Sequence, residues 1–383
     1  MSMTNWQVGW VRALADVRAF DSSSTNVTVR MRVLLTTAGD RFRIELSNAF
    51  GETPLVIGGA AVSVTNTSAP ILFDGSVAAN IPAGETRWSD AIELAVRRGD
   101  EVVVDLYLPE TTRHETGNFA RTPLELSAPG EHVGSRVFPA VATPMIPAPD
   151  GTEMAIPVPF LRAIATEGHK AEAVVACLGD SITAGGWPEE AANLLAGDRD
   201  VVMLNLGIAG NRLRVDPGPE TASFGRSGLS RFDDDVLAIA GVTDVVIALG
   251  TNDLGLPGSV TPADELPTAA EIIDAYSLLI DRAAAAGLHV LVATITPFMG
   301  AEGLDAARDR LRNEVNEWIR VSAPAMVDFD KAIRSPSSPS ELADEFDSGD
   351  HLHPNELGEA TLGAAIAAVL RARSARPIER GPR

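Results

Sequence analysis

The hydrophobic pattern of this chain changes near residue 171, and the change limits the folds that the chain can adopt. Before that point, short runs alternate between apolar and polar residues, at 27–35, 41–46, 56–65 and 101–108. Turn-forming residues separate the runs, such as the pair Gly39-Asp40. Short alternating strands divided by turns are typical of an antiparallel sandwich. We therefore expect a jelly-roll-like β-sandwich domain over residues 1–165, without a long helix.

After residue 171, short apolar runs alternate with amphipathic stretches of helical length. The runs are 173–178, 201–206, 244–249, 290–295 and 325–329. The helical stretches are 188–195, 230–239, 269–286, 304–321 and 357–370. Strand–helix repeats of this kind indicate a parallel sheet with helices on both faces. The sequence thus predicts an α/β domain over residues 166–383. Six prolines between residues 139 and 159 predict an extended connection before it.

Charge and composition narrow the classes of partner. The formal net charge of −21 opposes binding to phosphate backbones and to anionic membrane surfaces. Aromatic residues make up only 5% of the chain, which disfavours a surface that stacks on nucleic-acid bases. We therefore expect a small-molecule substrate, with no nucleic-acid or membrane partner. The sequence gives no indication of the oligomeric state.

The single cysteine, Cys177, argues against both a disulfide framework and a cysteine-based zinc site. It lies inside an apolar run, so we expect a buried thiol. The N-terminus lacks a basic segment followed by an apolar one, and no run of about 18 apolar residues occurs. The sequence as written therefore predicts a cytoplasmic protein.

Polar residues follow the predicted strands at the edge where open parallel sheets bind their substrates. Gly179-Asp180-Ser181 follows the first strand, which places a serine at the start of a helix. A helix N-terminus stabilises negative charge, so Ser181 could serve as a nucleophile whose own N–H faces a developing oxyanion. The alternative is that Ser181 only caps the helix. The sequence is not Gly-x-Ser-x-Gly, because Thr183 replaces the last glycine, which disfavours an α/β-hydrolase elbow.

Two further strand ends carry groups that suit an oxyanion hole. Gly210 follows the second strand, where a glycine allows its backbone N–H to come close to a substrate. Asn252 follows the third strand and offers an uncharged amide donor. Each signal is weak alone, since glycines after strands are common and Asn252 could instead form an Asx turn.

The segment from Asp347 to Asn355 contains a candidate base. Histidine has a pKa suited to accepting the serine proton, and a carboxylate can orient its ring. Asp350 and His353 are three residues apart, so one turn of chain can place both at one site. The competing interpretation is a metal site built on His351 and His353 with flanking aspartates, which would need ligands from other strand ends.

These segments, in this order, resemble the SGNH (GDSL) hydrolase family. Gly179-Asp180-Ser181 matches its first block, Gly210 its second, Gly250-Thr251-Asn252-Asp253 its third, and Asp350-x-x-His353-Pro354 its fifth. Thr183-Ala184 departs from the acidic residue that many members carry there. The β-rich first part of the chain also resembles the N-terminal sandwich of bacterial two-domain GDSL-like lipases or acylhydrolases. The resemblance to this group rests on Leu46-Ser47-Asn48-Ala49-Phe50-Gly51 and on the segment from Asp347 to Asn355, and Arg231-Phe232-Asp233 fits the same group.

The resemblance implies a flavodoxin-like three-layer α/β/α domain over about residues 171–372. It also implies that Ser181 is the nucleophile, His353 the base and Asp350 its partner. The oxyanion hole would then consist of the N–H groups of Ser181 and Gly210 and the side chain of Asn252. No metal or organic cofactor is implied.

The expected substrate is a small soluble ester with a short acyl group, such as an acetylated carbohydrate. One alternative is a lysophospholipase or lipase acting on longer acyl chains. An alternative of another class is a non-catalytic carbohydrate-binding protein on an esterase fold. The sandwich is either a carbohydrate-binding module or a domain that stabilises the hydrolase and shapes its cleft. We favour the second, because the sequence shows no row of exposed aromatic residues.

Overall fold

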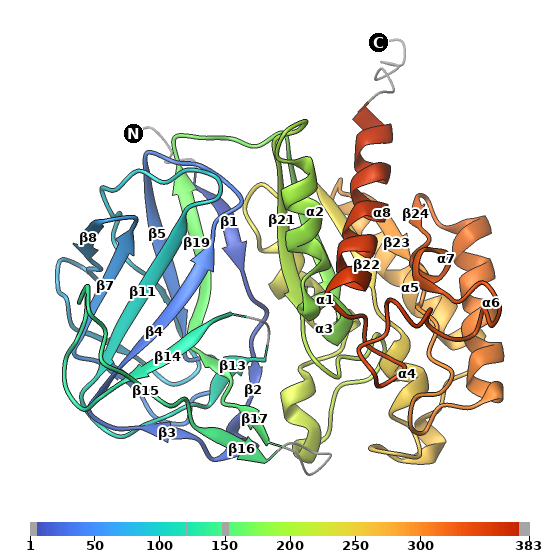
Figure 1. Cartoon of the computed structure of the whole chain (residues 1–383), viewed down its shortest axis with the longest axis horizontal. Helices are drawn as coiled ribbons and strands as arrows, with labels where there is room; N and C mark the ends of the chain where they lie inside the picture. Colours follow the sequence, from blue (N-terminus) through green and yellow to red (C-terminus); the bar gives the residue numbers. More distant parts are fainter. Residues whose placement is uncertain (1–5, 120–121, 148–152, 375–383) are drawn as a thin grey trace.

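The computed structural model of the chain describes residues 6–119, 122–147 and 153–374. It places a β-rich region beside an α/β region (Figure 1). Two antiparallel sheets dominate the first region. One has the order β1 (Gln7–Val11), β19 (Leu161–Glu167), β5 (Arg41–Ser47), β10 (Thr86–Trp88). The other has the order β15 (Ala140–Val141), β14 (Leu124–Ser127), β4 (Val27–Leu34), β11 (Glu101–Leu108), β7 (Gly59–Val64), β8 (Thr67–Pro70).

Short strands complete this region and connect it to the rest of the chain. They pair as β12 (Thr112–Arg113) with β3 (Ser23–Ser24), β16 (Met145–Pro147) with β17 (Glu153–Ala155), and β6 (Leu55–Ile57) with β9 (Ala79–Ile81), while β18 (Val158–Pro159), β13 (Thr116–Asn118) and β2 (Ala15–Asp16) form a trio. The only helical element described before residue 170 is the 3-10 turn Arg18–Phe20, which confirms the expected absence of a long helix. The proline-rich connection contains short strands where it is described; residues 148–152 lie outside the described part.

The alternation of apolar and polar residues explains why these strands form a sandwich. Side chains at every second position of a strand point to the same face. In β11, Val102, Val104 and Leu106 are fully buried, and they belong to the cluster that fills the space between the two sheets. The fold class predicted for this region, an antiparallel sandwich, is confirmed.

The second region is a five-stranded parallel sheet between two layers of helices. Its order is β21 (Val201–Gly207), β20 (Ala173–Gly179), β22 (Asp244–Ala248), β23 (His289–Ala293), β24 (Met326–Val327). This order has the flavodoxin-like pattern, in which the second strand of the chain lies at one edge. The helices are α1 (Ser181–Gly185), α2 (Trp187–Leu195), α3 (Gly228–Phe232), α4 (Thr251–Gly255), α5 (Ala269–Ala285), α6 (Ala306–Ser322), α7 (Phe329–Ile333) and α8 (Glu356–Ser374).

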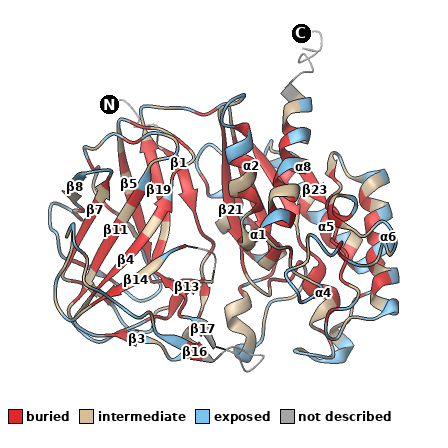
Figure 2. Cartoon of the chain, viewed as in Figure 1, coloured by how far each residue is buried: buried red, intermediate tan, exposed pale blue. Residues whose placement is uncertain are grey.

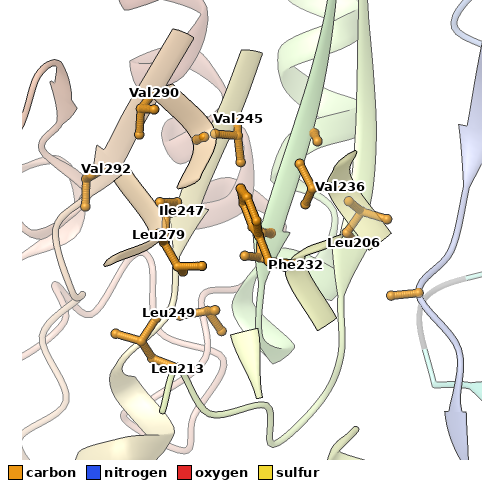
Figure 3. Close-up of a cluster of buried hydrophobic side chains, with 14 of the residues drawn as sticks. Leu206, Leu213, Phe232, Val236, Val245, Ile247, Leu249, Leu279, Val290 and Val292 are labelled. Atoms are coloured by element: carbon orange, nitrogen blue, oxygen red, sulfur yellow. The ribbon is translucent and has the colours of Figure 1, made fainter. Parts of the chain in front are cut away.

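Each face of the parallel sheet has its own apolar cluster. One cluster joins the sheet to α2, α7 and α8 and contains Cys177, which is fully buried as expected. The other joins the opposite face to α3, α5 and α6, and Figure 3 shows part of it, with Phe232 and Leu279 beside the strand residues Val245 and Ile247. The three-layer architecture is thereby confirmed. No helix in the described ranges combines the length and hydropathy that a membrane span requires.

The two regions share a core. Val8 and Val11 of β1 and Ala163 of β19 belong to the same apolar cluster as Leu204 and Leu206 of β21. Figure 2 shows buried residues continuing across this junction. The sandwich therefore covers the edge of the parallel sheet that β21 would otherwise expose. The predicted domain boundary between residues 165 and 166 falls within β19 and stays a prediction.

Candidate active site

Ser181 lies where β20 passes into α1. Asp180, not Ser181, is the N-cap of this short helix, and its carboxylate accepts a hydrogen bond from the N–H of Ile182 at 3.0 Å. The serine hydroxyl is therefore not used as a cap. It lies instead 2.8 Å from Nε2 of His353. The structure thus favours the nucleophile interpretation of Ser181 over the helix cap.

His353 links Ser181 to Asp350. Its Nδ1 lies 2.6 Å from Oδ2 of Asp350, so one ring contacts both partners. Burial alone would raise the pKa of Asp350. Hydrogen bonds from the side chain and N–H of His353 and from the N–H of Leu352 together have the larger effect, and they lower this pKa to about 2. The carboxylate is therefore ionised in neutral and mildly acidic solution and can hold the imidazole in one orientation.

The loop that carries this pair is fixed by its own hydrogen bonds. Oδ1 of Asp347 accepts from the N–H of Gly349 at 2.8 Å and of His351 at 3.0 Å. Asn355 accepts from the N–H of Gly358 in the first turn of α8 and donates to the carbonyl of Asp347. These contacts place His353 at the N-terminus of α8, opposite the N-terminus of α1.

His351 belongs to a second, separate pair. Its Nδ1 lies 2.7 Å from Oδ2 of Asp347, whereas His353 contacts Asp350 and Ser181. Within the described residues, no group of three or more histidine, cysteine or acidic side chains is placed to hold a metal ion. The two histidines thus have different partners, which does not favour the metal-site interpretation.

The two other predicted site residues lie on neighbouring loops. Gly210 has a φ of +77°, and a Cβ there would lie 2.3 Å from the ring of Phe224, so only glycine fits. Asn252 is at the start of α4, and its Nδ2 donates to the carbonyl of Asn211 at 3.0 Å. An amide nitrogen carries two N–H bonds, so the second remains for a ligand. The N–H groups of Ser181 and Gly210 make no hydrogen bond to another described residue.

Asn211 and Arg231 organise these loops, and the sequence did not single them out as site residues. Asn211 donates from Nδ2 to the carbonyls of Phe224 and Arg226. Its Oδ1 accepts from Arg231, whose guanidinium also donates to the carbonyl of Gly179 at 2.9 Å. Arg231 is 1% exposed. This buried arginine therefore connects the end of β20 to the Gly210 loop. The sequence pointed to it only through the segment Arg231-Phe232-Asp233, which resembles the two-domain family members.

Two buried carboxyl groups lie beneath the site. Burial raises the pKa of Asp180 to about 7 and that of Asp253 to about 6. Asp253 nevertheless accepts two backbone hydrogen bonds, from Leu213 at 2.6 Å and from Arg214 at 3.1 Å. Each carboxyl group accepts hydrogen bonds that hold a loop of the site in place. Because its pKa is raised in the folded state, each also makes the free energy of unfolding depend on pH.

Replacing Asp180 by Asn should flatten the dependence of stability on pH. A carboxyl whose pKa rises on folding binds its proton more tightly in the folded state. The free energy of unfolding should therefore fall as the pH rises from the ordinary value of 3.8 to about 7. One proton contributes about 1.4 kcal/mol per pH unit within that window. Asn keeps an acceptor for the helix cap but cannot ionise.

Urea unfolding at a series of pH values measures this effect. In Asp180→Asn, the free energy of unfolding should fall less steeply with pH than in the wild type, up to about pH 7. In Asp253→Asn, the same difference should end at about pH 6, because the raised pKa of Asp253 lies there. If the free energy of unfolding of Asp180→Asn depends on pH as steeply as that of the wild type, Asp180 does not have a raised pKa in the folded state.

A cavity of about 220 Å³ opens beside the Ser181 hydroxyl. The hydrolase domain provides most of its wall, and Phe119 of the β-rich region provides one side. Its lining residues are Phe119, Ser181, Ile182, Ala184, Gly185, Ala209, Ser348, His353, Pro354 and Glu359. The sequence did not predict Phe119 or Glu359 at this site. The cavity can hold a small acyl or alcohol group next to the serine.

Comparisons with known proteins identify the second domain. Residues 177–361 match the model of the GDSL-like Lipase/Acylhydrolase family. A solved carbohydrate acetylesterase from Sinorhizobium meliloti is 19% identical, with 53% of this chain and 100% of that one covered and a TM-score of 0.42. An acetyl xylan esterase from Geobacillus stearothermophilus is 18% identical, with 52% and 94% covered and a TM-score of 0.41.

A third structure, the inhibitor-bound form of an aryl esterase from M. smegmatis, is 18% identical, with 52% and 99% covered and a TM-score of 0.42. Among curated proteins, none matches this chain. The family match covers every predicted site residue, from Ser181 to His353. Residues 177–361 therefore form a domain of the GDSL-like lipase/acylhydrolase family.

Proposed function

We propose that the chain is a serine-dependent carboxylic ester hydrolase that acts on small soluble esters with short acyl groups, including acetylated carbohydrates. The observation that carries the proposal is the continuous set of contacts from the Ser181 hydroxyl through His353 to Asp350. A hydroxyl, an imidazole and a carboxylate in this order are what nucleophilic catalysis by serine requires.

The reaction proceeds through an acyl-enzyme. Oγ of Ser181 attacks the ester carbonyl carbon while Nε2 of His353 takes the hydroxyl proton. The tetrahedral intermediate collapses, the bond to the alcohol oxygen breaks, and His353 returns the proton to the leaving alcohol. Water then attacks the acyl group with His353 again as base, which releases the acid and restores Ser181. Asp350 stabilises the imidazolium in both steps.

Asn252→Ala should lower kcat by roughly 10²–10³ and change KM much less, because an oxyanion donor acts chiefly in the transition state. The N–H groups of Ser181 and Gly210 would supply the other two donors. Steady-state kinetics on a soluble acetate ester measure both constants. If kcat is unchanged, Asn252 has no part in the oxyanion hole.

A series of p-nitrophenyl esters from acetate to palmitate tests the acyl preference. The cavity of about 220 Å³ suits a short acyl group, so kcat/KM should be highest for acetate and fall as the chain lengthens. A maximum at long chains would favour a lysophospholipase or lipase. Cleavage of no ester in the series would favour a non-catalytic binding protein.

A further inference from the structure

A second cavity, of about 390 Å³, lies between the sandwich and the hydrolase domain. The sandwich lines one side with residues of β1, β4 and β11, and α1, α2 and α8 line the other. It shares Ala184, Gly185 and Glu359 with the cavity beside Ser181, so the two cavities border each other. A ligand large enough to extend from the serine past Gly185 would therefore enter this second cavity.

Arg12 gives this cavity a hydrogen-bond donor that has no acceptor. It follows β1, lines the cavity, and its side chain is only 7% exposed. One guanidinium nitrogen lies 3.0 Å from Glu189 of α2, but Nε is buried without a hydrogen-bond partner among the described residues. A buried N–H without an acceptor is costly unless a ligand or water supplies one.

Glu190 offers the complementary group. It lines the same cavity from α2 and is half-buried, and its side-chain carboxylate makes no hydrogen bond or ion pair with another described residue. A single hydroxyl group can accept from Arg12 and donate to a carboxylate, which a purely cationic or anionic group cannot do. Trp10 lines the cavity as well and adds an apolar ring. Donors, acceptors and a ring together suit an alcohol with several hydroxyl groups.

We propose that this interdomain cavity binds the alcohol part of the ester, that this alcohol is polyhydroxylated, as in a sugar, and that Arg12 is a binding residue for it. The proposal rests on the ester hydrolase function proposed above. It gives the sandwich a direct part in substrate selection, because Trp10 and Arg12 come from its first strand and the residue that follows.

The test compares two acetate esters by the release of acetate. One is xylobiose with a single acetyl group, and the other is methyl acetate, whose alcohol is too small to reach the second cavity. Arg12→Met removes the guanidinium. Leu34→Trp narrows the cavity from the sandwich side at a side chain that is already 51% exposed, so it should not disturb folding. Leu278→Trp is the matched control, because Leu278 is 50% exposed and lines neither cavity.

In both cavity variants the ratio of kcat/KM for acetylated xylobiose to that for methyl acetate should fall about tenfold, mainly through KM, because lost contacts to a non-reacting part weaken binding. Leu278→Trp should keep the wild-type ratio. An unchanged or raised ratio in Leu34→Trp overturns the proposal, as does a fall in kcat/KM for methyl acetate in that variant without one for acetylated xylobiose. A wild type that cleaves neither ester contradicts the hydrolase function itself, and not only the alcohol site.

Discussion

Ser181→Ala should reduce ester hydrolysis by roughly 10⁴-fold or more, to the background that the remaining binding groups sustain. Its hydroxyl is the only one placed against Nε2 of His353 among the described residues, so no neighbour can replace it. Loss of the hydroxyl removes the acyl-enzyme route altogether. Acetate release from a soluble acetate ester measures the effect.

The Ser181→Ala variant should fold normally. The hydroxyl does not cap α1, because Asp180 does so, and thermal unfolding should stay close to that of the wild type. Ser259→Ala is a suitable control, since Ser259 is an exposed serine whose hydroxyl contacts only backbone carbonyls. Activity retained in Ser181→Ala would refute the nucleophile assignment.

Asp350→Asn should lower kcat by roughly 10³–10⁴. The carboxylate accepts from Nδ1 of His353, which leaves Nε2 free to take the serine proton. An amide N–H facing Nδ1 would favour the other tautomer, with its proton on Nε2. Asn keeps one oxygen for the N–H groups of Leu352 and His353, so the loop should retain its shape.

Asp347→Asn provides the matched control for Asp350→Asn. The same loop carries it, and it makes the equivalent contact with His351, at 2.7 Å. Because His351 does not contact Ser181, this variant should lose less than about tenfold in kcat. A larger loss from Asp347→Asn than from Asp350→Asn would identify His351 as the base and contradict the account.

The strand–helix pattern predicted the α/β domain well, but not its short helices. α1, α4 and α7 have five residues each, too few to show a helical period in the sequence. The run 325–329 was predicted as a strand, but β24 is only Met326–Val327, and Phe329 begins α7. The last helix was predicted to end at residue 370. It continues to Ser374, with Arg371 and Arg373 paired to Asp198 and Asp244.

The motifs predicted that Gly210 and Asn252 lie near Ser181 because each of the three follows a strand of one sheet, and parallel strands end at a common edge. Asp350 and His353 come instead from the loop before α8. Phe119 and Arg12 were missed for a physical reason. They come from the sandwich, and they line the two neighbouring cavities only because the sandwich packs against the hydrolase domain. No local pattern marks a contact between segments so far apart in the chain.

Reaction with a serine-directed organophosphonate, followed by peptide mass spectrometry, tests the central claim most directly. The reagent forms a stable bond only with a hydroxyl that a neighbouring base activates. The account predicts one adduct per chain, located on Ser181, and none in Ser181→Ala. An adduct on another residue, equal labelling of Ser181→Ala, or an unlabelled wild type would contradict it.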